Sequence, residues 1–127
     1  MRVYYEDTDA AGVVYYANYL RFMERARTEW LASLGFPLAA FEREHGLAFV
    51  VHRVQIDFLS PARLNDRLDV TVEPVDRGAC RLVTTQEARR GTTTLTRARV
   101  ALACVDMARW KPVRMPEPLQ HALESAS

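Results

Sequence analysis

The chain has 127 residues, of which 49% are hydrophobic and 26% charged, and its formal net charge at pH 7 is +1. This size and composition predict a single globular domain over residues 1–127, and the nearly neutral charge argues against nucleic acid as a partner. No apolar run approaches the roughly 20 residues that span a bilayer, and no hydrophobic leader follows Met1, so we expect a cytoplasmic protein without stable membrane insertion.

The first predicted elements are a short strand at residues 3–5 and a turn at residues 7–12, with the sequence Asp-Thr-Asp-Ala-Ala-Gly. A helix is predicted at residues 17–34, because apolar side chains recur at helical spacing: Tyr19, Leu20, Met23, Ala26, Trp30, Leu31 and Leu34. Gly35 and Pro37 end this helix.

The turn directs the N-terminus of the predicted helix back toward Asp7 and Asp9. Unpaired backbone N–H groups and the positive end of the helix dipole lie at such a terminus, and both suit a developing oxyanion. From the spacing alone, either aspartate could instead form an Asx-turn or cap the helix, and Asn18 could cap a helix that starts later.

The rest of the chain predicts short helical segments and four strands. Residues 37–44 fit a short helix, and residues 116–127 fit a short helix or a frayed tail, with Leu119, Ala122 and Leu123 on one stripe. Strands are predicted, from alternating apolar and polar residues, at residues 47–59, 68–73, 80–88 and 92–105. In the first of these strands, the apolar face contains Val50, His52, Val54, Ile56 and Phe58.

The order of one strand, a helix and four consecutive strands predicts an α+β fold with an antiparallel five-stranded sheet. The basic turn at residues 89–91 favours a hairpin between the last two strands. The helix at residues 17–34 is the only long amphipathic element available to cover one face of the sheet. A sheet of this size leaves apolar surface and an exposed edge unless it associates, so we expect a homo-oligomer.

Several kinds of chemistry lack the residues that they require. Cys80 and Cys104 are expected to be reduced packing thiols. The three histidines, His45, His52 and His121, lie apart without an acidic cluster beside them, so no metal site is predicted. His52 is interpreted as a hydrogen-bonded core or interface histidine and not as a catalyst. A Gly-x-Ser-x-Gly elbow and a Walker-type phosphate loop are both missing from the sequence.

Residues in the first part of the chain carry a resemblance to a known family. They form the pattern Asp-x-Asp-x-x-Gly-x-Val-x-Tyr-x-x-Tyr, from Asp7, Asp9, Gly12, Val14, Tyr16 and Tyr19. This pattern resembles the active-site signature of the 4-hydroxybenzoyl-CoA thioesterase family, which has the hotdog fold. Further segments resemble, more narrowly, the Tol-Pal system-associated acyl-CoA thioesterases (YbgC-type): residues 2–9, 24–29, 58–64, 104–106 and 111–112. Tyr16 departs from that subfamily, which usually has histidine there, and the departure leaves the preferred acyl group open.

The resemblance implies an antiparallel five-stranded sheet wrapped around one central helix, and an acyl-CoA substrate hydrolysed without a cofactor to a free acid and CoA. It maps the catalytic aspartate onto Asp9, which would attack the carbonyl or activate water, and it maps the carbonyl-polarising backbone amide onto Tyr16. Gly12 would permit close approach to the substrate. Family members are dimers with active sites between subunits, and the subfamily often pairs dimers into tetramers.

The substrate-binding residues are predicted from side-chain chemistry. Tyr16, with Tyr15, Tyr19 and Trp30 nearby in the sequence, favours a pocket for short-chain or aromatic acyl groups, although core and interface packing would explain these rings equally well. The phosphates of CoA require basic side chains. The candidates are Lys111 and Arg114 first, followed by Arg63, Arg89 and Arg90.

Two other functions fit this sequence less well. A hotdog scaffold that holds acyl carrier protein or Tol-Pal envelope components would not need Asp9 and Gly12. A hotdog hydratase normally needs an aspartate and a histidine in one site, and residues 2–31 contain no histidine.

Overall fold

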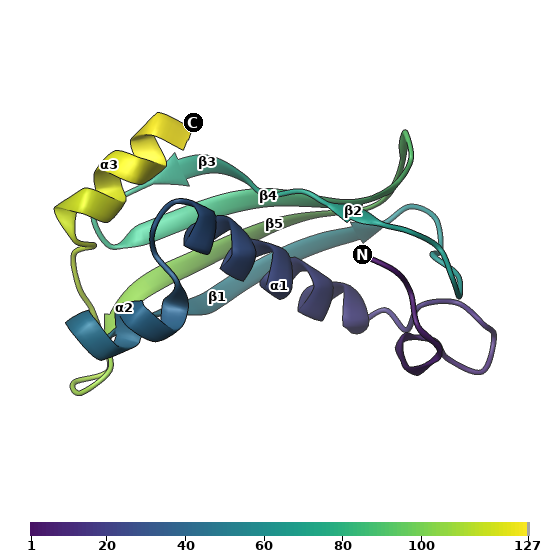
Figure 1. The fold of residues 1–127 in the computed structure, drawn as a ribbon, viewed down its shortest axis with the longest axis horizontal. Helices are drawn as coiled ribbons and strands as arrows, with labels where there is room; N and C mark the ends of the chain where they lie inside the picture. Colours follow the sequence, from purple (N-terminus) through teal and green to yellow (C-terminus); the bar gives the residue numbers. More distant parts are fainter. Residues whose placement is uncertain (127) are drawn as a thin grey trace.

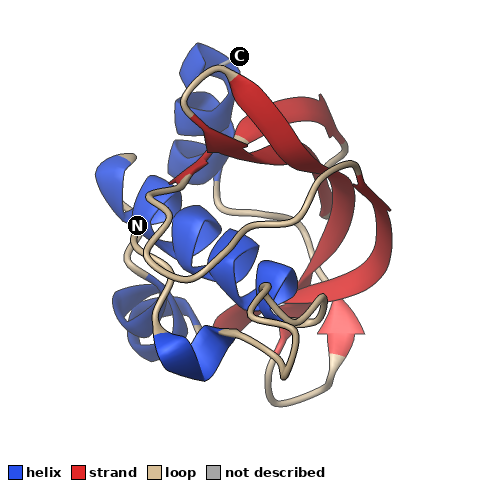
Figure 2. Cartoon of the chain, turned by 90° about the vertical axis from the view of Figure 1, so that its right-hand side faces the viewer, coloured by secondary structure: helices blue, strands red, loops and turns tan. Residues whose placement is uncertain are grey.

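A computed structural model describes residues 1–126 of the chain (Figure 1). Over this range, a six-stranded antiparallel sheet packs against the long helix α1, residues Asn18–Ser33, and two shorter α-helices. The helices lie on one side of the curved sheet, and the other side carries no helix in the described chain (Figure 2). The α+β class and the antiparallel sheet are therefore confirmed, with one strand more than the five expected.

Helix α1 confirms the predicted helix to within one residue at each end. It buries Tyr19, Phe22, Met23 and Leu31. The buried stripe differs from the expected one at two positions, because Leu20 is 43% exposed whereas Phe22 is 1% exposed. Phe22 lies one turn after Tyr19, and the two rings pack edge-on with 6.0 Å between their centroids.

The two shorter helices also follow the prediction. They are α2, residues Leu38–His45, and α3, residues Glu117–Ala126. Ser127, the last residue of the predicted tail, lies outside the described residues. The tail is anchored rather than frayed, because Leu119 and Leu123 are 0% and 1% exposed and join the same core cluster as Met23 and Leu31 of α1.

The sheet has the strand order β1-β5-β4-β2, with β3 also paired to β4 and β6 paired to the end of β5. In chain order the strands are β1 (Leu47–Phe58), β2 (Asp69–Val70), β3 (Glu73–Arg77), β4 (Arg81–Arg90), β5 (Thr93–Asp106) and β6 (Lys111–Pro112). β4 and β5 form the predicted hairpin. Within residues 1–126, this order leaves the long strand β1 at one edge of the sheet with its outer side unpaired.

Strand β1 contains a bulge between Val51 and Arg53. The extra residue, His52, shifts the alternation, so that Val51 pairs with Leu102 on the helix side of the sheet and Val50 faces the other side. The predicted face containing both Val50 and His52 is therefore wrong for the first half of the strand. His52 is exposed, so it is not a core residue of the single chain, and its place in an interface stays a prediction.

The predicted strand at residues 3–5 is wrong. Residues Tyr5–Asp7 form a short 3-10 helix, and Arg2 makes only an isolated β-bridge. The carboxylate of Asp7 accepts a hydrogen bond from the Tyr4 N–H at 3.0 Å. This contact turns the chain at the place where a strand would continue straight.

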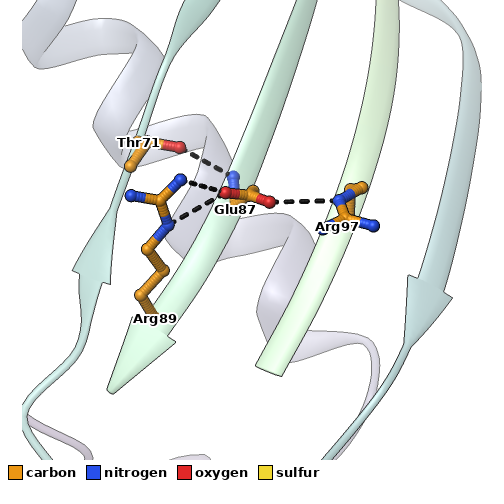
Figure 3. Close-up of polar contacts among 4 residues, drawn as sticks. All are labelled: Thr71, Glu87, Arg89 and Arg97. Atoms are coloured by element: carbon orange, nitrogen blue, oxygen red, sulfur yellow. Dashed lines mark hydrogen bonds and ion pairs between the residues drawn. The ribbon is translucent and has the colours of Figure 1, made fainter. Parts of the chain in front are cut away.

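The predicted strand at residues 68–73 is divided into β2 and β3. Thr71 Oγ1 accepts a hydrogen bond from the Glu87 N–H at 2.9 Å, so a side-chain hydroxyl takes the place of a backbone carbonyl in the ladder (Figure 3). The Thr71 N–H still donates to the Glu87 carbonyl at 2.8 Å. The two short strands therefore stay aligned along the same edge of β4.

On the side of the sheet without helices, Glu87 is the centre of an ion cluster (Figure 3). Nε of Arg89 and Nε of Arg97 donate hydrogen bonds to its carboxylate at 2.9 and 3.0 Å. The bonds from Arg89 and then Arg97 lower the pKa of Glu87 below its ordinary value, while partial burial opposes them. Arg89, a candidate for binding CoA phosphates, is therefore already engaged.

Cys80 and Cys104 are free thiols on neighbouring parts of the chain, where the Cys104 N–H donates to the Cys80 carbonyl at 2.8 Å. Burial raises the pKa of the Cys104 thiol to about 11, with a further contribution from Cys80. Such a thiol stays protonated at neutral pH and is a poor nucleophile, as expected for a packing cysteine.

Candidate active site

The acidic hairpin, residues 7–14, joins the N-terminal 3-10 helix to the start of α1. It is closed by hydrogen bonds from the Asp9 N–H to the Val13 carbonyl at 2.9 Å and from the Gly12 N–H to the Asp9 carbonyl at 3.0 Å. Gly12 has φ +79°, which favours glycine, and a Cβ there would meet no atom within 4 Å. Gly12 is therefore needed for its backbone conformation, and its predicted close approach to substrate stays a prediction.

Asp9 lies at the turn of the hairpin and is exposed. Its Oδ1 accepts a hydrogen bond from the Ala11 N–H at 2.8 Å, which is the Asx-turn that the spacing had left open. Its second oxygen, Oδ2, accepts no hydrogen bond from residues 1–126. One oxygen thus orients the carboxylate, and the other is open to a substrate or a water molecule.

Asp7 connects the hairpin to the helix and is only 3% exposed. Its carbonyl accepts hydrogen bonds from the Tyr15 N–H and from Nδ2 of Asn18, both at 3.0 Å. Its carboxylate holds the Tyr4 N–H, as described above. The interpretation of Asp7 as the residue that shapes the loop is confirmed, and the same contacts fix Asp9 relative to the start of α1.

The start of α1 presents backbone donors without partners. Ala17 occupies the N-cap position and forms no side-chain cap, and Asn18 is used to hold Asp7 instead of capping the helix. The N–H groups of Tyr16 and Ala17 donate no hydrogen bond within the described chain. Unpaired donors at the positive end of a 16-residue helix can stabilise an oxyanion.

An apolar pocket of about 280 Å³ lies beside these donors. It is lined by Val14, Tyr16, Tyr19, Phe58, Leu59, Ser60 and Pro61. The ring of Tyr16 stands edge-on to Phe58 at 6.1 Å between centroids, and Tyr16 is 61% exposed. The pocket therefore connects the N–H donors of the helix start to the C-terminal end of β1.

The other predicted aromatic residues occupy three different positions. Tyr19 is 3% exposed and forms a fixed wall of the pocket, where its hydroxyl accepts a hydrogen bond from the Ala62 N–H at 3.0 Å. Tyr15 is 46% exposed, and its ring lies 4.8 Å from that of Tyr16. Trp30 lines a separate pocket farther along α1.

Lys111 and Arg114 lie at the opposite end of the sheet from the acidic hairpin. Lys111 pairs with Asp106 at the end of β5, whereas Phe58 in the pocket wall pairs with Thr96 near its start. The ten residue steps from Thr96 to Asp106 span roughly 30 Å of strand. One chain therefore does not bring these two basic residues to the acidic hairpin.

Arg63 is the basic candidate that does lie beside the hairpin. Its backbone forms a β-bridge with Val13, and its guanidinium forms no hydrogen bond or ion pair with residues 1–126. Arg90 is engaged in an ion pair with Asp66 at 2.8 Å. Among the basic candidates, the geometry of one chain favours Arg63 for a phosphate near this site.

Phe58 is a pocket residue that the sequence analysis did not assign to the site, although it predicted the apolar face that contains this residue. Its 50% exposure at the end of β1 gives it a place in the pocket wall. No cluster of three or more His, Cys, Asp or Glu side chains in residues 1–126 is placed to hold a metal ion. None of the helices in that range has the length and apolar character that crossing a membrane requires.

The sequence and the fold are similar to those of known proteins. The model of the Thioesterase-like superfamily matches residues 3–123. The chain is 45% identical to Acyl-CoA thioesterase YbgC from Haemophilus influenzae, over 96% of this chain and 90% of that protein. It is 39% identical to 1,4-dihydroxy-2-naphthoyl-CoA hydrolase from Thermosynechococcus vestitus, over 98% and 86% of the two chains. A crystal structure of a probable thioesterase from Bartonella henselae has a TM-score of 0.86 at 35% identity, covering 91% of this chain and 95% of that one.

Proposed function

The chain belongs to the Thioesterase-like superfamily and is an acyl-CoA thioesterase, and we propose that it hydrolyses the thioester between the acidic hairpin and the start of α1. One observation carries this assignment: the free oxygen of Asp9 and the free N–H groups of Tyr16 and Ala17 are fixed to each other through Asp7. A scaffold protein would have no use for a free carboxylate oxygen and unpaired amide donors in one ordered segment.

In the proposed mechanism, the thioester carbonyl oxygen accepts hydrogen bonds from the N–H groups of Tyr16 and Ala17. These donors become more important as negative charge grows on that oxygen, and the helix dipole adds to their effect. The acyl group lies in the apolar pocket beside Phe58. The thioester is already activated, so positioning and electrostatic stabilisation supply the catalysis and no cofactor is required.

Two routes are compatible with the free oxygen of Asp9. As a nucleophile, Oδ2 attacks the carbonyl carbon, the C–S bond breaks, CoA leaves as a thiolate and water hydrolyses the resulting anhydride. As a general base, Oδ2 takes a proton from a water molecule, which attacks the same carbon and displaces the same thiolate. Both routes yield a free acid and CoA.

We expect short-chain or aromatic acyl-CoA to be preferred over long-chain acyl-CoA. The pocket of about 280 Å³ is smaller than the roughly 300–1,000 Å³ usual for larger ligands, and aromatic rings form its walls. Release of free CoA from butyryl-, benzoyl- and palmitoyl-CoA measures this preference. The kcat/KM for the better of the first two should exceed that for palmitoyl-CoA by about tenfold or more. A clear preference for palmitoyl-CoA would contradict the assigned acyl pocket.

We also propose that the enzyme works as a homo-oligomer joined through β1. This 12-residue strand has an unpaired outer edge and an exposed Val51. Antiparallel pairing with the β1 of a second copy would bring the Leu47 end of one strand beside the Phe58 end of the other. The partner's Lys111 and Arg114 would then approach the acidic hairpin, where they could join Arg63 in binding CoA phosphates.

Light scattering at micromolar concentrations should therefore give the mass of a dimer or a tetramer, with no monomer in the active sample. A charge at the edge, as in Val51→Lys, should weaken this association, because Val51 is 40% exposed on β1. The matched control is Val75→Lys, because Val75 is exposed and lies in β3 rather than β1. A compact monomer with full hydrolytic activity would show that the site needs no second copy.

A further inference from the structure

A second pocket, which we call the Arg27 pocket, lies between the second half of α1 and the sheet. Its volume is about 240 Å³, and it shares no lining residue with the pocket beside the acidic hairpin. Its lining residues include Glu24, Arg27, Thr28, Leu31, Phe49 and Leu102. Apolar side chains from α1, β1 and β5 thus surround one half-buried cation.

A hydrogen bond to Gln86 of β4 holds the guanidinium of Arg27 against the sheet. Its Nη1 donates a hydrogen bond at 2.8 Å to Oε1 of Gln86, which is 0% exposed. Nε2 of Gln86 donates in turn to the Met23 carbonyl at 2.9 Å. Because the Gln86 amide nitrogen is committed to α1, its oxygen faces Arg27, and this bond holds the guanidinium against the sheet.

The Arg27 guanidinium has no ion-pair partner among the described residues. The bond to Gln86 uses one of its five N–H donors. Burial lowers the pKa of the guanidinium from its ordinary value, and the charge of nearby Glu24 opposes that effect. A half-buried cation with free donors in an apolar pocket has the character of a receptor for an anion.

The ligand must be an anion with an apolar body. The guanidinium fork matches a carboxylate in geometry, and the walls from Leu31, Phe49 and Leu102 require hydrocarbon against them. Glu24 is exposed, so water screens its charge at the mouth of the pocket while Arg27 acts in its depth. The volume is below the usual range for larger ligands, which restricts the body to a short chain or one ring.

We propose that the Arg27 pocket is a binding site for small apolar carboxylates, with the carboxylate on Arg27 and the hydrocarbon against α1 and β1. Free acids released by thioester hydrolysis belong to this chemical class. The site does not use Asp9, so it binds such acids whether or not the enzyme turns over.

Isothermal titration of the full chain carrying Asp9→Asn, with benzoate and with hexanoate at pH 7, tests the proposal in the absence of hydrolysis. We expect saturable binding of at least one of these acids. Benzamide, which has the same ring without the charge, should bind at least about tenfold more weakly to the same protein. This comparison needs no change at Arg27 and therefore does not depend on the folding of a further variant.

Arg27→Met, which keeps a long apolar stem without the charge, should weaken carboxylate binding by about tenfold or more, and Arg27→Lys should retain part of it. The matched control is Arg25→Met on the exposed side of the same helix, which should leave binding unchanged. Absence of carboxylate binding, or equal binding of benzoate by the Arg27→Met and Arg25→Met proteins, would overturn the proposal. Neither result would bear on Asp9, because hydrolysis is not measured.

Discussion

Asp9→Asn lowers the turnover of the best acyl-CoA substrate by roughly 10²–10⁴-fold, the range usual for the loss of a positioned base, with little change in folding or oligomeric state. Asparagine keeps the size of the side chain and an oxygen that can accept the hydrogen bond from the Ala11 N–H. It removes the charge and the second oxygen, which either attacks the carbonyl carbon or takes a proton from water. Steady-state release of CoA measures the effect.

Asp7→Asn is the matched control for this experiment. Asp7 is buried and bonds to the backbone, so this change should lower the free energy of unfolding more than Asp9→Asn does, and turnover less. Thermal unfolding and light scattering establish that both variants are folded and associated. If the folded Asp9→Asn protein hydrolysed its best substrate within about threefold of the wild-type rate, the mechanism would have to be abandoned.

Leu119→Ala lowers the free energy of unfolding by about 2–5 kcal/mol, which is a large part of the stability of a domain this size. Leu119 is 0% exposed and anchors α3 in the core cluster that contains Met23 and Leu82. Truncation removes its apolar contacts and leaves a cavity beneath the helix. Urea unfolding at one fixed protein concentration measures the loss.

The matched control is Leu64→Ala, because Leu64 is 43% exposed and the same atoms are removed without leaving a cavity. That variant should remain within about 0.5 kcal/mol of the wild-type free energy of unfolding. Equal losses at the two positions would mean that α3 contributes no more to the core than an exposed loop does.

The regular elements could be predicted because their periods depend on neighbours in the sequence. The bulge at His52 could not be predicted in this way. One extra residue moves every preceding side chain of β1 to the opposite face of the sheet, and the composition of the strand gives no sign of it. The break at Thr71 depends on a hydroxyl that bonds to Glu87, 16 residues away. The predicted strand at residues 3–5 is wrong for a similar reason. The Asp7 carboxylate accepts a hydrogen bond from the Tyr4 N–H, and the strand pattern does not indicate this contact.

The candidate site was predictable to the extent that it lies in one continuous segment. Asp9 and Tyr16 come from a signature in which spacing and chemistry coincide, and the structure adds the contacts of Asp7 that connect them. The bond between Arg27 and Gln86 joins residues 59 positions apart, and no local pattern indicates it. Lys111 and Arg114 were selected for their charge, which carries no information on the end of the sheet that they occupy.

The closed acidic hairpin also determines when the conformational entropy of its residues is lost. Because the Asp9 N–H, the Gly12 N–H and the Asx-turn hold the loop in the free chain, its ordering is a cost of folding and not of substrate binding. A loop ordered only by its substrate would weaken affinity at every encounter. The Asp9 carboxylate is already oriented when the thioester binds. The binding energy of the substrate therefore remains available for stabilising the transition state.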